Sequence, residues 1–188
     1  MSENAEEPKK FDTNRRYCEL EEELIDLFIK QISHELTNRH IYLSFANFFA
    51  NEGLNKLSEY YLKRAEEEDN HHKWIYNWLT YNDVEFQYPN IQTLELNYDD
   101  RSFPFQFTVD REIETTDKID NILEKALELK DYRTIAWLNG NGPVEGKLIP
   151  EQAEEESISR TIRDIAAEEN TSWLIKEESI YNFYFNKN

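Results

Sequence analysis

Apolar positions recur every three or four residues over long stretches of this chain, which is the spacing of a helix face rather than of a strand. One such pattern runs from about Asn14 to Ala50, is interrupted at residues 51–53, and resumes from Asn55 to Tyr81. Residues 82–101 show no helical periodicity. The first half of the chain therefore predicts two long antiparallel helices followed by an extended connection.

The second half repeats this arrangement with one interruption. A third helix can begin at Ser102, with Pro104 in its first turn, and end near Lys130. The remaining elements are a helical segment at 131–138, an irregular stretch NGNGPVEGKLIP at 139–150, a helix from Pro150 to about Glu168, and a short aromatic helix at 171–185. Four long helices with a long connection between the second and third predict an all-α four-helix bundle with a crossover.

Composition and charge narrow the class of protein. The 188 residues suit one domain, predicted over 14–188 behind a polar arm at 1–13, and hydrophobic residues make up 39% of them. The net charge of -18 argues against nucleic acid and anionic membranes as partners and is compatible with attracting cations. With the single cysteine Cys18, no apolar leader segment in the first twenty residues and no run long enough to span a bilayer, we expect a cytoplasmic protein.

The inward-facing line of each long helix, called its seam here, is apolar at one or both ends and polar in the middle. Tyr42 lies on the first seam and Arg64 on the second. The polar centres of the four seams are Glu35, Glu68 with His71, Glu112, and Gln152 with Glu155. In an up-down bundle these centres reach a similar height, so they are predicted to meet in one layer of the core.

Four carboxylates in one buried layer require compensating positive charge. Each costs several kcal/mol to remove from water, and like charges add to that cost. Two divalent cations would neutralise four carboxylates, and oxygen-rich ligation with one imidazole suits iron or manganese better than a structural zinc. The i,i+3 pairs Glu68–His71 and Gln152–Glu155 allow two ligands on one helix to hold the same site.

A plainer interpretation applies to the neighbouring polar residues in RAEEEDNHH. Runs of glutamate are mostly solvated helix faces, and histidine pairs are mostly at the surface. Glu66 and Asp69 do not fit the seam and are expected to be solvated, and His72 is expected at the surface.

With these residues in place, the chain resembles ferritin over most of residues 20–185. ISHELTNRHIYLSFANFF is similar to the first ferritin helix, with Glu35 and Tyr42 at the site positions. AEEEDNHH matches the second-helix E-x-x-H, REIETTDKI the third-helix glutamate, and EQAEEES the fourth-helix pattern of prokaryotic-type non-haem ferritins. Residues 171–185 resemble the ferritin fifth helix.

The resemblance implies a ferroxidase. Two Fe(II) ions would be oxidised by dioxygen, or by peroxide, and Fe(III) would pass as mineral into a homo-oligomeric 24-subunit cage. One iron would be held by Glu35, Glu68 and His71, and the other by Glu112 and Glu155, with Glu68 bridging. By the same resemblance Gln152 would lie close by, Glu67, Glu151 and Glu154 would form a third iron site, and Tyr42 would hydrogen-bond near the centre or pack in the core.

Related families on the same fold fit less well. Bacterioferritin and rubrerythrin-type centres carry E-x-x-H on the fourth helix too, where this chain has Gln152-x-x-Glu155, and the haem methionine of bacterioferritin has no counterpart because Met1 is the only methionine. Mini-ferritins build their site between subunits, whereas the predicted ligands here all belong to one chain. The stretch NGNGPVEGKLIP departs from ferritin by breaking the fourth helix. The sequence therefore does not define the iron entry route, and Glu145 is the candidate pore acid.

Two competing functions remain at this point. The chain could be a di-metal oxidase or peroxide-detoxifying protein that never stores mineral. It could also be a scaffolding bundle with a vestigial acidic seam, although four unmetallated carboxylates would then repel one another.

Overall fold

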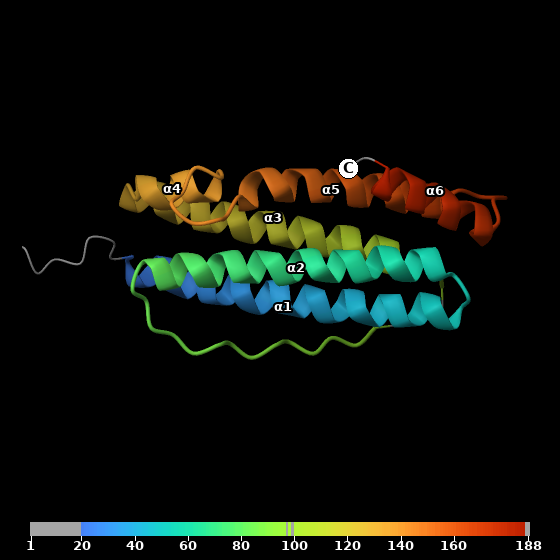
Figure 1. Cartoon of the computed structure of the whole chain (residues 1–188), viewed down its shortest axis with the longest axis horizontal. Helices are drawn as coiled ribbons and strands as arrows, with labels where there is room; N and C mark the ends of the chain where they lie inside the picture. The colour runs from blue at the N-terminus through green and yellow to red at the C-terminus, as the bar shows by residue number, and fades with distance from the viewer. Residues whose placement is uncertain (1–19, 97, 99, 187–188) are drawn as a thin grey trace, which may run out of the picture.

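The computed structural model describes residues 20–96, 98 and 100–186, and these form a helical bundle (Figure 1). The helices of the described residues are α1 (Glu22–Asn51), α2 (Asn55–Tyr81), α3 (Phe103–Leu129), α4 (Tyr132–Leu138), α5 (Leu148–Ala167) and α6 (Trp173–Phe185). The four long helices α1, α2, α3 and α5 confirm the predicted fold class. The predicted arm at 1–13 lies outside the described residues.

The long connection between α2 and α3 runs the length of the bundle, as Figure 1 shows, so that α2 and α3 are parallel. Hydrogen bonds fasten it to α1, because the Ser33 hydroxyl donates to the Asn90 carbonyl at 2.6 Å and the Gln92 amide donates to the Thr37 hydroxyl at 3.2 Å. After α4, the chain returns along α3 as α5, and α6 packs against the ends of α2 and α5.

Two predicted helix starts need correction. The first helix was predicted to start near Asn14 and so to include Leu20 and Glu21, but α1 begins only at Glu22. Residues 14–19 lie outside the described part. The helix expected from Pro150 begins at Leu148, because the Leu148 side chain is buried and packs as part of the bundle. Proline is tolerated here, since the amide it lacks would have no partner in the first turn of a helix.

The break between α4 and α5 is an ordered structure. The Asp131 carboxylate caps α4 by accepting hydrogen bonds from the amides of Arg133 and Thr134, both at 3.2 Å. Residues 139–147 fold over the buried Trp137, whose indole N–H donates to the Glu145 carbonyl at 3.1 Å. A Cβ at position 146 would collide with the indole ring, so only glycine fits this approach.

The core consists of two apolar clusters with polar side chains between them. The Phe45 cluster joins α1, α2, α3, α5 and α6, and includes Phe45, Phe49, Tyr61, Phe105, Ile162 and Ile180. The Trp137 cluster lies at the other end of the bundle and includes Phe28, Ile32, Trp78, Ile119, Trp137 and Leu148. Within the described ranges, none of the helices combines the length and apolar character needed to cross a lipid bilayer.

Candidate metal centre

The polar residues between the two clusters are buried and come from all four long helices. We call this set the polar layer; it contains Glu35 of α1, Arg64, Glu68 and His71 of α2, Glu112 of α3, and Gln152 and Glu155 of α5. Each of these residues is at most 4% exposed. The 3-4 spacing of the seams brings them together because residues at that spacing share one helix face.

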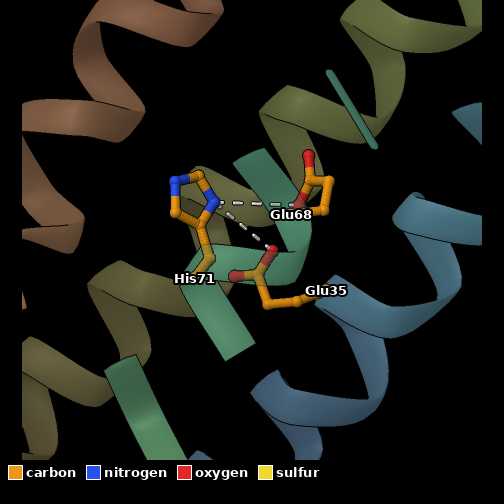
Figure 2. Close-up of side chains that lie close together, drawn as sticks. All are labelled: Glu35, Glu68 and His71. Atoms are coloured by element: carbon orange, nitrogen blue, oxygen red, sulfur yellow. Dashed lines mark ion pairs between the residues drawn. The ribbon is translucent and has the colours of Figure 1, made fainter. Parts of the chain in front are cut away.

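Glu35, Glu68 and His71 form the first group that could hold a metal ion, with one ligand atom from each within 4.8 Å of the others. Figure 2 shows the His71 ring facing both carboxylates. Its Nδ1 atom lies 3.9 Å from Glu35 Oε2 and 3.8 Å from Glu68 Oε2. These distances leave room for a cation between the three side chains.

The two carboxylates of this group have opposite pKa shifts. Burial raises the pKa of Glu35 well above its usual value, and the adjacent Glu68 raises it further. Burial acts in the same direction on Glu68, but its close contacts with His71 and Glu35 outweigh it and lower its pKa to about 2. The metal-free pair therefore keeps a proton on Glu35, while the Gln31 amide donates to Glu35 Oε1 at 2.6 Å and fixes its orientation.

The second group consists of Glu68, Glu112 and Glu155, and Glu155 also falls within the same 4.8 Å limit of His71 and Glu151. Glu155 Oε1 lies 3.5 Å from His71 Nε2, so His71 faces both groups. Burial raises the pKa of Glu155 to about 8, although His71 and Arg64 act against the shift.

Arg64 supplies a positive charge to the second group. Its side chain is fully buried, and its guanidinium donates to Glu112 Oε1 at 2.5 Å and to Glu67 Oε2 at 3.0 Å. It also lies 3.4 Å from Glu155 Oε1. The seam pattern places Arg64 one turn before Glu68, but position on the seam alone does not predict that its guanidinium balances the carboxylates.

Tyr42 and Gln152 both contact Glu112. The Tyr42 hydroxyl donates to Glu112 Oε1 at 2.5 Å, and burial raises the pKa of Tyr42, so the hydroxyl keeps its proton. The Gln152 amide donates to the Glu112 carbonyl at 3.0 Å and to its Oε2 at 3.1 Å. Both oxygens of Glu112 therefore have protein partners, whereas Glu35, Glu68 and Glu155 each keep one oxygen without a hydrogen bond among the described residues.

The residues expected at a third site line one cavity next to the polar layer. Glu67, Glu151 and Glu154 border this cavity of about 360 Å³, together with Arg64 and Tyr184. The Tyr184 hydroxyl of α6 donates to Glu67 Oε1 at 2.5 Å. Glu151 is ion-paired with Lys147, and Glu154 is exposed. The structure thus gathers the three carboxylates around one space, with Glu151 already partnered.

Among the remaining polar residues, which were predicted to lie outside the centre, the predicted exposure is wrong for one. Glu66 is exposed and Asp69 is partly exposed beside Lys73, as expected. His72 was expected at the surface, but it is only 7% exposed. The crossover connection covers it, since Tyr88 packs edge-on against its ring at 6.3 Å between centroids. Glu145, the candidate pore acid, is exposed on the 139–147 loop.

His34 is a buried histidine that the sequence pattern did not identify. Its Nε2 atom lies 2.7 Å from the Thr115 hydroxyl, and the Arg111 guanidinium donates to Nδ1 at 2.8 Å. Burial, with Arg111 second, lowers the pKa of His34 to about 3, so the ring is neutral. The sequence pattern gave no signal that His34 is buried, because His34 lies one residue off the seam.

The fold and the polar layer together define a class: a four-helix bundle with a buried carboxylate–histidine centre suited to divalent cations. The ferritin-like domain model matches residues 25–141, more than half of the chain. The chain therefore belongs to the ferritin-like family.

Individual relatives agree with this assignment. A bacterial non-heme ferritin of Staphylococcus aureus (strain USA300) is 25% identical over 163 residues, covering 85% of this chain and 94% of that protein. Its counterpart from Staphylococcus saprophyticus is 27% identical over the same length, covering 93% of that protein. The open-pore ferritin of Archaeoglobus fulgidus has the same fold, with a TM-score of 0.76 at 21% identity, over 86% of this chain and 96% of that one.

Proposed function

We propose that this chain is an iron-storage ferroxidase. It oxidises Fe(II) to Fe(III) with dioxygen at a di-iron centre within one subunit and deposits the mineral in a 24-subunit homo-oligomeric cage in the cytoplasm. Membership of the ferritin-like family and similarity to proteins named bacterial non-heme ferritins support the class of substrate. The chemistry of the polar layer supports the reaction.

One observation carries the proposal. Glu35 Oε2, Glu68 Oε2 and Glu155 Oε2 are buried without a hydrogen-bond partner among the described residues. A buried carboxylate oxygen left unpaired is costly, and most buried polar atoms in folded proteins have partners. Metal coordination would satisfy these oxygens, and hard oxygen ligands with one imidazole suit Fe(II).

Each residue then has a specific role toward the iron substrate. Glu35, Glu68 and His71 would hold one ion, Glu112 and Glu155 the other, and Glu68 would reach both because it belongs to both candidate groups. Gln152 and Tyr42 would orient Glu112 through the hydrogen bonds already described. Glu67, Glu151 and Glu154 line the adjoining cavity and would receive a third ion.

The reaction balances with dioxygen as the oxidant. Two Fe(II) ions lose one electron each, and dioxygen accepts the pair with two protons. The protein contributes by holding two ions close together and leaving coordination positions open for oxygen. Binding the ions also displaces protons from ligands such as Glu35, whose pKa is raised by burial.

The test is the double substitution Glu68→Ala with His71→Ala. It removes two of the three ligands of the first group, so rapid Fe(II) oxidation, followed by absorbance of the ferric product, should disappear while the particle still assembles. Asp69→Ala with His72→Ala is the matched control, because it removes an acid and a histidine at the same spacing one residue further along α2. Oxidation at an unchanged rate in the first variant would refute the site.

Iron loading separates storage from the alternative of a non-storing di-metal oxidase or peroxide-detoxifying protein. A storage protein continues to take up iron well beyond the capacity of its centres, whereas the alternative stops when the centres are filled. Measuring iron per particle after stepwise Fe(II) addition in air, with size determined by light scattering, distinguishes the two and also tests the cage.

A further inference from the structure

The two halves of the polar layer are unequal because only one contains an arginine. Arg64 contacts Glu112 at 2.5 Å and Glu155 at 3.4 Å. None of the ion pairs described for Glu35 involves an arginine or lysine; its ion-pair partner is His71. A metal ion entering the Glu112–Glu155 half therefore meets the guanidinium of Arg64, whereas an ion entering the Glu35 half does not.

The guanidinium competes for the same oxygens that a second metal ion would need. It occupies Glu112 Oε1, which also accepts from Tyr42, and it lies near Glu155 Oε1. A guanidinium at hydrogen-bond distance and a divalent cation cannot share these oxygens without strong repulsion in a buried site. Filling this half requires the Arg64 side chain to move.

The structure provides a place for Arg64 to go. The side chain borders the cavity of about 360 Å³, and its Nη1 atom already donates to Glu67 on the side of that cavity. Glu151 and Glu154 line the same cavity, so a guanidinium displaced into it would remain paired with carboxylates. Arg64 is also incompletely satisfied where it lies, since its Nε atom has no hydrogen-bond partner in the described part of the chain.

We propose that Arg64 is a tethered cation that neutralises the Glu112–Glu155 half of the centre until a second metal ion displaces it toward Glu67. The two halves then fill in order and with unequal affinity, first at Glu35–Glu68–His71. This inference rests on the proposed function, because it assumes that the polar layer binds metal ions.

Calorimetric titration with Zn(II), which does not change oxidation state, tests the inference on the assembled protein. The unaltered chain should bind one ion tightly and a second more weakly at the centre. Arg64→Gln should strengthen the second step by about tenfold or more, because the competing charge is gone, and leave the first step nearly unchanged. Arg64→Lys, which keeps the charge, should keep the second step weak.

Lys63→Gln is the matched control. Lys63 is the adjacent residue and lines the same cavity, but it pairs with the exposed Glu66 rather than with the polar layer. Removing its charge should leave both steps unchanged. An equal gain in the second step for Lys63→Gln and Arg64→Gln would mean that general charge, not the position of Arg64, sets the affinity, and would overturn the inference.

Crystals of the unaltered chain at limiting and saturating Zn(II), with anomalous data at the zinc edge, give an answer that does not depend on any variant folding. We expect zinc only at Glu35–Glu68–His71 at first, and then at both halves with the guanidinium turned toward Glu67. Simultaneous filling of both halves, with Arg64 still on Glu112, would refute the role of Arg64. No zinc in either half would instead refute the proposed function on which it rests.

Discussion

The Trp137 cluster and the polar layer are neighbours along the bundle and share α1, α2, α3 and α5, with α4 added to the cluster, yet they are stabilised in different ways. The Trp137 ring stacks on Trp78 at 5.1 Å and meets Phe28 edge-on at 5.6 Å, so this cluster is held together by apolar packing, with the Trp78 indole N–H as its one buried side-chain group without a partner among the described residues. The polar layer contains buried carboxylate oxygens without partners among the described residues. The first region stabilises the bundle by itself, whereas the second depends on a cation from outside the chain.

The largest effect should come from emptying the apolar region. Trp137→Ala removes a fully buried ring and should lower the free energy of unfolding by about 3–5 kcal/mol. Because the cluster has no metal ligands, urea unfolding should show the same loss in chelator and in saturating Zn(II). Glu68→Gln should instead have an effect that depends on the metal, because it removes a candidate ligand. This variant should lose the stabilisation that Zn(II) gives to the unaltered chain. If zinc cancelled the effect of Trp137→Ala, the two regions would not be independent.

A smaller effect should distinguish His34, which lies beside the polar layer but has protein partners, from the candidate ligands. Its pKa of about 3 in the folded chain is below the ordinary 6.5, so folding favours the neutral ring. This contribution is fully present above pH 6.5 and is lost as the pH falls toward 3. Between pH 6.5 and 5 the loss should be about 2 kcal/mol.

His34→Gln checks this pH dependence because it removes the titrating group while keeping a polar side chain. Unfolding free energies measured with chelator at several pH values should fall less steeply for the variant than for the unaltered chain. Parallel curves for the two proteins would show that His34 does not carry the effect.

The smallest effect should come from the start of α4, outside both regions. Asp131→Ala removes the carboxylate that accepts from the amides of Arg133 and Thr134, and should cost about 1 kcal/mol. Asp120→Ala, at an exposed position within α3, is the control and should change stability much less. Thermal unfolding of both variants checks the comparison, and equal shifts would contradict the capping role.

The helical periodicity was sufficient to predict the bundle and its polar layer. Positions such as Glu35 and Glu112 are fixed by the 3-4 spacing, because a helix face is determined by residue number alone. The crossover followed from the residues between Tyr81 and Ser102, where the periodicity is absent. The metal-ligand roles assigned from the ferritin resemblance remain predictions.

Other features could not be predicted, because they depend on long side chains and on contacts between distant segments. The position of Arg64 on its helix was evident, but its guanidinium lies several rotatable bonds from the backbone and selects its partners from three helices. His72 was misjudged because the burial comes from Tyr88, on a connection without periodicity. The start of α5 at Leu148 depends on packing against the rest of the bundle, which a local pattern does not contain.

The loop over Trp137 has a consequence for how this chain can vary. Gly142 and Gly146 both approach the indole so closely that a Cβ at either position would overlap it. Any larger side chain there would lift the loop and admit water to the ring that closes one end of the bundle. The two inner glycines of the segment between α4 and α5 and the tryptophan beneath them thus form a unit that must be inherited together, and the exposed Gly140 is also constrained, because its φ of +84° strains any larger residue.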